Sequence, residues 1–400
     1  MDIRSDFSIL EKNPTLAYFD SASTTLMPKV VPAAISDFLN NVAVSTRRGA
    51  HSLATKGSVA VENTRNSIAE FLKTDSSQIS FQNSIPTAIA SFAFGYFKQN
   101  PEKKSIVVAE NEEHSVLVTL QRVSQILNLE LRTIPINETG LIDIQILDDL
   151  VDERTGITAV STVTVGWGVS NPIQQVSTIA HEKESVHICD ASRSIAFEEK
   201  MPMEFGVDFL VFSGNIGMMG PPGLTIQWLN KALSVNHIPG ILGGNSVSNV
   251  TASSFELALP PDKFESGTIN VPGIIGFHSA LRYITNLRKS GMIPYVKELS
   301  KYLQKRFGEM ESITVYGIPN DSTTIFGFNL GSDDGISCHD IALFLDESNI
   351  AVRSGLLCAH PLVKQVSPDG ILQVSLHAYN SIDDINRLVE NLQKIASDLI

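Results

Sequence analysis

Short apolar segments alternate with segments of helical periodicity along the first half of the chain, and this order constrains the fold most. Strands are predicted at 79–81, 105–109, 131–135, 158–163, 187–190 and 208–212, and helices at 61–72, from Pro86 onward and at 146–150. Such an order favours a mostly parallel sheet with helices on both faces. We therefore expect an α/β fold whose functional residues follow the carboxyl ends of the strands.

Length and charge exclude several classes of protein. The chain has 400 residues, 43 acidic and 30 basic, with a net charge of −13. It is long enough for one large and one smaller domain, and its acidic character argues against nucleic acid as a partner. Residues 1–6 lack the pattern of a secretory signal and no apolar run is long enough for a membrane span, so a cytoplasmic protein is expected. The three cysteines are too few and too scattered for a disulfide framework or a zinc site, and no metal is expected.

The segment 208–223 is an apolar strand followed by a Ser-Gly turn and a loop rich in glycine and proline. It resembles the cofactor-lysine segment of class V aminotransferases, the pyridoxal phosphate (PLP) enzymes that include cysteine desulfurases and selenocysteine lyases. The resemblance implies the PLP-transferase fold of aspartate aminotransferase, with cofactor contacts from Ser213 and Asn215. The family lysine follows Ser-Gly-His, and its position here falls on Ile216 or Gly217. Isoleucine has no amine, so PLP is implied by resemblance only and a covalent Schiff base is not expected.

Two further strand ends match the family and differ from it. Asp190 is retained where relatives place the carboxylate that keeps the pyridine nitrogen protonated. The glutamine that follows in relatives is Arg193 here, which either belongs to the cofactor clamp or pairs with Asp190. The histidine that stacks on the ring is replaced by Glu113. The next histidine survives as His114, either a catalytic base or a histidine satisfied by hydrogen bonds at a helix start.

Three other positions concern the coenzyme phosphate and ring. Ile85 and Pro86 replace the hydroxyl residues that cradle the phosphate, leaving either weak anion binding by the helix dipole or an ordinary capped helix. Val165 stands where relatives have an asparagine that bonds the ring hydroxyl. Thr268 is retained in a Phe-Glu-x-Gly-Thr phrase, and in class V homodimers this threonine reaches the phosphate of the neighbouring subunit.

The segment 349–361 resembles the loop that carries the persulfide cysteine in cysteine desulfurases of the sulfur-mobilisation type, and Cys358 occupies that position. Arg353 and His360 are close in sequence and favour a thiolate, whereas burial by Leu357 and its neighbour would raise the pKa of the thiol. Cys358 is therefore either a persulfide site or an inert remnant. Relatives bind the substrate carboxylate with an arginine at the position of Gln373, and glutamine offers no bidentate charged pair. Arg353 is also assigned to substrate by the resemblance.

The resemblance also covers a polar loop and the domain division. The loop around Arg47 and Arg48 is similar to one that borders the active site in relatives, and Arg48 is assigned to substrate, whereas Arg47 is expected to be solvated. A large PLP-transferase-like domain is expected at 16–272. A smaller α+β domain is expected at 273–400, together with residues 1–15.

Three hypotheses follow. The first is a homodimeric class V protein, with its cleft at the subunit interface, that performs no PLP chemistry and serves a sulfur-transfer pathway as partner, regulator or sulfur acceptor. The second is an active cysteine desulfurase or selenocysteine lyase that uses Cys358 with Asp190. The third is a protein adapted to another anionic ligand, with Arg48, Arg193 and Arg353 converging on the cleft.

Overall fold

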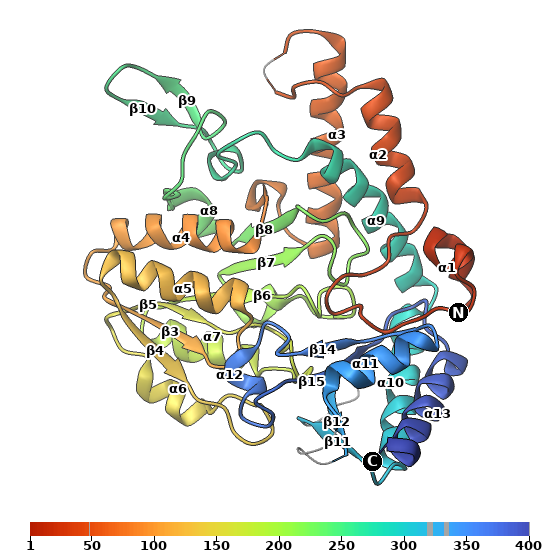
Figure 1. Cartoon of the computed structure of the whole chain (residues 1–400). Helices are drawn as coiled ribbons and strands as arrows, with labels where there is room; N and C mark the ends of the chain where they lie inside the picture. Colours follow the sequence, from red (N-terminus) through yellow and green to blue (C-terminus); the bar gives the residue numbers. More distant parts are fainter. Residues whose placement is uncertain (48, 318–322, 332–335, 400) are drawn as a thin grey trace.

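A computed structural model describes residues 1–47, 49–317, 323–331 and 336–399. Within these ranges the large domain is built on a seven-stranded sheet of order β2-β8-β7-β6-β5-β3-β4 (Figure 1). Neighbouring strands from β7 to β4 are parallel, whereas β8 is antiparallel to both of its neighbours. The predicted mostly parallel sheet is therefore confirmed. The strands are β2 (Ile79–Gln82), β3 (Ser105–Ala109), β4 (Glu130–Ile134), β5 (Thr155–Ala159), β6 (Val186–Asp190), β7 (Phe209–Ser213) and β8 (Thr225–Leu229).

Helices cover both faces of this sheet because alternate strand residues point to opposite sides. On β7, Phe209 and Val211 join the apolar cluster under α4 and α5, whereas Leu210 and Phe212 join the larger cluster on the other face. Figure 1 shows α4 and α5 above the sheet and α6 and α7 below it. The helices of this domain are α2 (Val30–Asn41), α3 (Ser52–Leu72), α4 (Ile85–Gln99), α5 (His114–Leu127), α6 (Ile144–Leu150), α7 (Ile173–Glu182) and α8 (Lys231–Asn236).

The C-terminal part forms a second, smaller layer. Its antiparallel sheet has the order β11-β12-β15-β14 and packs with α10, α11 and α13. Its elements are α10 (Met292–Gly308), β11 (Ile313–Tyr316), β12 (Ile325–Leu330), α11 (Cys338–Glu347), β13 (Ile350–Ala351), β14 (Arg353–Gly355), α12 (His360–Val363), β15 (Ile371–Ser375) and α13 (Ile382–Leu399). The long helix α9 (Val271–Lys289) connects the two parts and packs against α2 and α3.

The N-terminal segment joins this smaller layer. Strand β1 (Ala17–Tyr18) pairs with β13, and helix α1 (Ser8–Lys12) lies beside the same region (Figure 1). Arg4 lies 3.3 Å from Asp384 of α13, and Arg387 donates a hydrogen bond to the carbonyl of Thr15. At the opposite end, the hairpin of β9 (Val247–Val250) and β10 (Phe255–Leu257) projects from the body.

Two predicted elements differ from the structure by three residues or more at one end or both. The helix predicted at 61–72 begins at Ser52, because the side chain of His51 accepts a hydrogen bond from the N–H of Ala54 and caps the first turn. The strand predicted at 158–163 is β5 and ends at Ala159. Beyond Ala159 the N–H groups of Val160 and Thr162 still donate to carbonyls of β6, whereas the N–H of Ser161 donates to the carboxylate of Glu112.

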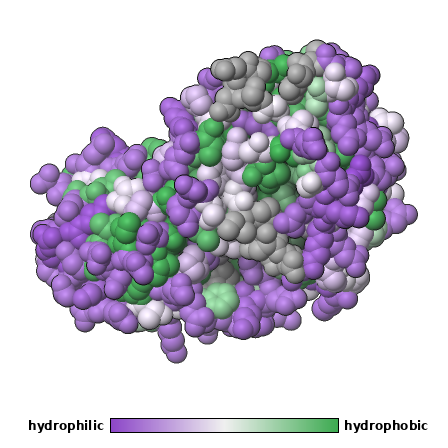
Figure 2. Space-filling model, turned by 90° about the horizontal axis from the view of Figure 1, so that it is seen from below, coloured by the Kyte–Doolittle hydropathy of each residue, from purple (hydrophilic) through white to green (hydrophobic). Residues whose placement is uncertain are grey.

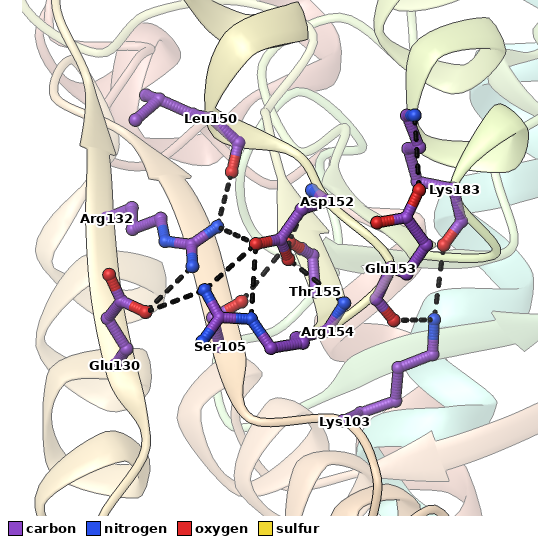
Figure 3. A network of polar contacts seen from close by, with 10 residues as sticks. All are labelled: Lys103, Ser105, Glu130, Arg132, Leu150, Asp152, Glu153, Arg154, Thr155 and Lys183. Atoms are coloured by element: carbon purple, nitrogen blue, oxygen red, sulfur yellow. Dashed lines mark hydrogen bonds and ion pairs between the residues drawn. The ribbon is translucent and has the colours of Figure 1, made fainter.

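A network of charged groups holds the amino-terminal ends of the parallel strands (Figure 3). Arg132 of β4 lies 2.7 Å from Glu130 and 3.1 Å from Asp152. Lys103 is buried, and its ammonium group donates to the carbonyls of Glu153 and Lys183. This edge is thus fixed by ion pairs and capped carbonyls, and the opposite, carboxyl-terminal edge is left for the functional residues.

The surface is predominantly hydrophilic in the view from below, with apolar residues gathered in a few patches (Figure 2). Among the described helices, none combines the length and the apolar character that crossing a membrane requires.

Candidate functional site

The loop after β7 is fixed by its own polar side chains. The hydroxyl of Ser213 donates to Asn215 Oδ1 at 2.9 Å, and Asn215 Nδ2 donates to Thr24 Oγ1 at 3.2 Å. The carbonyl of Asn215 also accepts from the N–H of Thr25 at 2.8 Å. Ser213 and Asn215 therefore lie together at the carboxyl edge of the sheet, as predicted, and each already has a protein partner.

The backbone decides which residue stands in the predicted lysine position. Gly217 has a φ of +70°, and a Cβ at this residue would lie 2.9 Å from the carbonyl oxygen of Ser192. A side chain at 217 would thus be strained and crowded, which leaves Ile216 as the position from which a side chain can project. Ile216 lines a cleft together with Arg193, Phe197 and His377.

This cleft is narrow. The space that Ile216 and Arg193 line measures about 10 Å³, which is room for about one water molecule. The ring of His377 donates from Nε2 to the carbonyl of Gly217 at 2.9 Å, since its Nδ1 accepts from the N–H of Ala378. Burial lowers the pKa of His377 to about 4, so the ring is neutral and acts as a fixed donor.

Arg193 and Glu113 meet across the carboxyl end of β5. Arg193 follows β6, Glu113 precedes α5, and β5 lies between β6 and β3 in the sheet. The guanidinium Nη1 lies 2.5 Å from Glu113 Oε2, with the Arg193 side chain 8% exposed and that of Glu113 20% exposed. Burial disfavours the charged guanidinium, but Glu113 and Asp190 outweigh it and raise the pKa of Arg193. The alternative in which Arg193 pairs with Asp190 was wrong, because the guanidinium extends to Glu113 instead.

Asp190 is buried and only half satisfied. Its Oδ1 accepts from the N–H and the hydroxyl of Ser192, at 2.8 and 2.5 Å, whereas Oδ2 has no hydrogen-bond partner in the described part of the chain. Burial and the nearby charge of Glu113 raise the pKa of Asp190 to about 6, although Arg193 acts in the opposite direction. Asp190 therefore presents a buried acceptor at the end of β6.

Glu112 is a carboxyl residue at the edge of the site that was not predicted from the sequence. It is fully buried, and its two oxygens accept from the N–H and the hydroxyl of Ser161, each at 2.5 Å. Burial raises the pKa of Glu112 to about 8, with Ser161 opposing the shift. The available signal was its place directly before Glu113, in the phrase that matches the family's Glu-His-His.

The predicted phosphate turn is a capped helix. Ser84 precedes α4, and its hydroxyl accepts from the N–H of Thr87 at 3.3 Å and lies 2.8 Å from the Thr87 hydroxyl. Ile85 is buried and Pro86 occupies the first turn. The hydroxyls of this turn are thus engaged with each other; whether the turn binds an anion stays a prediction.

Gln373 and Val165 lie against each other. The Gln373 amide donates to the carbonyls of Val165 and Gly166, and both Gln373 and Val165 are buried. The amide therefore stabilises the 164–169 loop.

Cys358 lies at the tip of a tight turn. Leu357 and Cys358 both have positive φ, +53° and +55°, so consecutive side chains diverge: Leu357 is buried among Val165 and Trp167, whereas Cys358 is exposed. The expected burial of this thiol by its leucine neighbours was wrong, because Leu357 packs away from it. Arg353 is 45% exposed, and its Nη1 lies 3.9 Å from Asp20.

Two histidines and one guanidinium lie near this turn. The N–H of His114 donates to the carbonyl of Cys358 at 3.0 Å, and the rings of His114 and His360 meet edge to face with centroids 4.4 Å apart. Burial and His360 lower the pKa of His114 despite the charge of Glu113. Arg193 is close enough for the charge of a Cys358 thiolate to raise the pKa of the guanidinium. The structure thus brings together Glu113, His114, Arg193 and Cys358.

Thr268 and the arginine loop lie apart from this cluster. Thr268 is exposed and lines a cavity of about 460 Å³ with Phe38 and Asn245. Arg48 lies outside the described residues. The prediction of a solvated Arg47 was wrong: its guanidinium lies 2.5 Å from Glu265, whose buried carboxylate needs a counter-charge.

A large, mostly parallel sheet with a polar cluster at its carboxyl edge, closed by a smaller antiparallel layer, defines an α/β protein of the PLP-transferase fold. The chain belongs to the Aminotransferase class-V family, whose model matches residues 17–388.

Relatives within this family agree over nearly the full length. The chain is 30% identical to a cysteine desulfurase of Escherichia coli over 399 residues, covering 98% of this chain and 97% of the relative. It is 29% identical to a probable cysteine desulfurase of Methanothermobacter thermautotrophicus, covering 99% and 98%. The apo structure of a cysteine desulfurase from Thermococcus onnurineus superposes with a TM-score of 0.92 at 27% identity, covering 100% of this chain and 98% of that one. The chain is thus cysteine desulfurase-like.

Proposed function

We propose that this protein is a class V homologue that forms no Schiff base with PLP and acts as a sulfur acceptor and relay through Cys358. One observation carries the first half of the proposal: the side chain that projects into the cleft after β7 is Ile216, and among the described residues no lysine lines that cleft. An imine needs a primary amine, and an alkyl side chain supplies none. The residues present therefore do not fit covalently held PLP.

The second half of the proposal rests on the Cys358 turn. The thiol is exposed, the backbone N–H of His114 donates to the Cys358 carbonyl, and the Arg193 guanidinium is close enough to interact with a Cys358 thiolate. Cations and hydrogen-bond donors favour a thiolate, which is the nucleophile in thiol exchange. The Cys358 thiolate attacks the terminal sulfur of a donor persulfide, the donor's S–S bond breaks, and the donor leaves as a thiolate. The resulting persulfide on Cys358 then passes its terminal sulfur to the next thiolate, so no external oxidant or reductant is consumed.

The test has two parts. The purified protein, incubated with a protein persulfide donor and no PLP, is expected to gain the mass of one sulfur atom by intact mass spectrometry. Cys358→Ser is expected to gain none, whereas Cys338→Ser, which removes a buried cysteine, behaves as the native protein. Incubation with PLP and free cysteine is expected to give neither Schiff-base absorbance nor sulfide. A clear yield of either defeats the proposal.

A homodimer in the cytoplasm is part of this proposal. Thr268 is exposed beside the cavity that Phe38 lines, and the β9–β10 hairpin carries the exposed apolar residues Val250 and Phe255. A second copy of the chain would cover these groups. The free thiols, one of them exposed, suit a reducing compartment. Sedimentation velocity at micromolar concentration is expected to give a dimer, and a monomer there contradicts this part.

An active cysteine desulfurase or selenocysteine lyase is the second candidate. It is favoured by the free Oδ2 of Asp190, a buried acceptor of the kind that a pyridinium N–H would satisfy. Loss of measured desulfuration in Cys358→Ser, from a native protein that has such activity, would establish it.

Binding of a different anionic ligand is the third candidate. A cavity of about 240 Å³ is lined by three basic residues and two acidic ones: Arg193, Lys200, Lys297, Glu198 and Glu199. Ligand density in that cavity with the shape of a small carboxylate or phosphate, and not of PLP, would favour this candidate.

A further inference from the structure

The ion pair of Glu113 and Arg193 lies where the family resemblance would put the coenzyme ring. The family resemblance puts the ring-stacking group at Glu113 and the ring-nitrogen carboxylate at Asp190, so a coenzyme ring would lie between these two positions. Arg193 starts on the same loop as Asp190, and its guanidinium ends against Glu113, 80 residues away in sequence. It therefore crosses the space over the end of β5 where the ring would lie.

Distances decide whether pair and ring can coexist. A planar ring needs about 3.5 Å between its face and any atom that packs on it. The guanidinium nitrogen already lies 2.5 Å from the Glu113 carboxylate, so the space against this carboxylate is filled. The cleft that Arg193 lines together with Ile216 has a volume of about 10 Å³. A ring can enter only if the ion pair breaks.

Breaking the pair is costly because both groups are shielded from water. The Arg193 side chain is 8% exposed, and its Nε has no hydrogen-bond partner within the described residues. The described residues give the Arg193 side chain one ion pair, that with Glu113. Displacing Glu113 would remove this ion pair from a buried cation and leave it with the longer-range attraction of Asp190 alone, and loss of a partner from a buried ion pair is strongly unfavourable.

We propose that the Glu113–Arg193 ion pair is a built-in occupant of the coenzyme ring's place, and that this pair closes the cleft to PLP independently of the missing amine. This inference deepens the proposed function and rests on it, since both require a protein without PLP. It adds that noncovalent PLP is excluded as well. The Oδ2 of Asp190, left without a partner, is the part of the ring site that the pair does not use.

The test distinguishes the effect of the Glu113–Arg193 ion pair from the effect of the missing lysine amine at position 216. Four proteins are compared: the native chain, Ile216→Lys, Glu113→His/Arg193→Gln, and the triple variant. Noncovalent PLP is measured by equilibrium dialysis, and the Schiff base by absorbance that borohydride removes. The native chain and Ile216→Lys are expected to retain no PLP. The double variant is expected to bind PLP noncovalently, at least roughly tenfold tighter than the native chain, and the triple variant to form the Schiff base.

Ile216→Lys/Arg132→Gln is the matched control, since it removes two ion pairs at the amino-terminal ends of the strands of the same sheet and is expected to bind no PLP. Schiff-base formation by Ile216→Lys alone, or no PLP on the folded triple variant, overturns the inference and leaves the proposed function standing. A Schiff base in the native chain overturns the proposed function itself.

A second measurement uses the unmodified protein, so that it does not depend on how the variants fold. Native crystals soaked in PLP are expected to show the Glu113–Arg193 pair intact and no ring density beside Asp190. Density for the PLP ring beside Asp190, with the Glu113–Arg193 pair displaced, refutes the proposal that this pair closes the cleft to PLP.

Discussion

Glu265 is the buried charge on which the arginine loop and the Thr268 segment depend, and Glu265→Gln is the most informative stability variant. Its side chain is 0% exposed. Oε1 accepts from Arg65 and from the N–H of Phe81, each at 2.8 Å, and Oε2 accepts from Arg47 at 2.5 Å. Glutamine keeps the size and one acceptor, but its amide group points a donor at the Arg47 guanidinium.

The expected loss follows from this count. Two arginines lose their buried counter-charge: Arg47 keeps Asp262, whose side chain is 43% exposed, and Arg65, whose side chain is 1% exposed, keeps Glu62 as its charged partner. Removing one partner of a buried ion pair costs about 3–5 kcal/mol. We therefore expect the free energy of unfolding, measured by urea denaturation with far-UV circular dichroism, to fall by about 3 kcal/mol or more.

Glu62→Gln is the matched control, because it removes a second carboxylate from the same arginine. The Glu62 side chain is 50% exposed and pairs with Arg65 three residues along one helix. Such solvated pairs contribute about 0–1 kcal/mol. A loss below about 1 kcal/mol for Glu265→Gln, or equal losses for the two variants, refutes the reasoning that burial sets the cost.

Three further predictions concern single groups. Burial raises the pKa of Glu112 from 4.5 to about 8. The contribution of this carboxyl to stability is therefore fully present below pH 4.5 and is lost at about 1.4 kcal/mol per pH unit as the pH rises toward 8. Glu112→Gln is expected to flatten this part of the pH profile of the free energy of unfolding. In the native protein a maleimide is expected to label Cys358, and Cys189 and Cys338 only after denaturation, by peptide mass spectrometry. Lys103→Met leaves two carbonyls without their donor and is expected to lower the free energy of unfolding by about 2 kcal/mol in urea denaturation.

Each of these has an outcome that contradicts it. An unchanged pH slope in Glu112→Gln shows that another group carries the proton. Labelling of Cys189 by maleimide in the native protein would place that thiol at the surface. Lys104→Met, at the exposed neighbouring lysine, is the control for Lys103→Met, and equal effects of the two would remove the role of the buried carbonyls.

The sheet and its order were predictable because strand and helix periodicities are local properties. The apolar run Phe209–Phe212 reads as a strand in isolation and is one. The predicted bounds were wrong where the chain makes contacts distant in sequence: directly after β5, the N–H of Ser161 donates to Glu112, 49 residues away. No local pattern contains that contact.

The candidate site divides in the same way. The sequence by itself determined that the residue after Asn215 is an isoleucine and that a cysteine ends the Arg353 loop, since these are questions of residue type and spacing. Only the tertiary structure decided that Arg193 pairs with Glu113, that Arg47 is buried against Glu265, and that Cys358 is exposed beside a buried Leu357. The physical reason is that a charge selects its partner by distance and desolvation, and both are set where strand ends from separate parts of the chain meet.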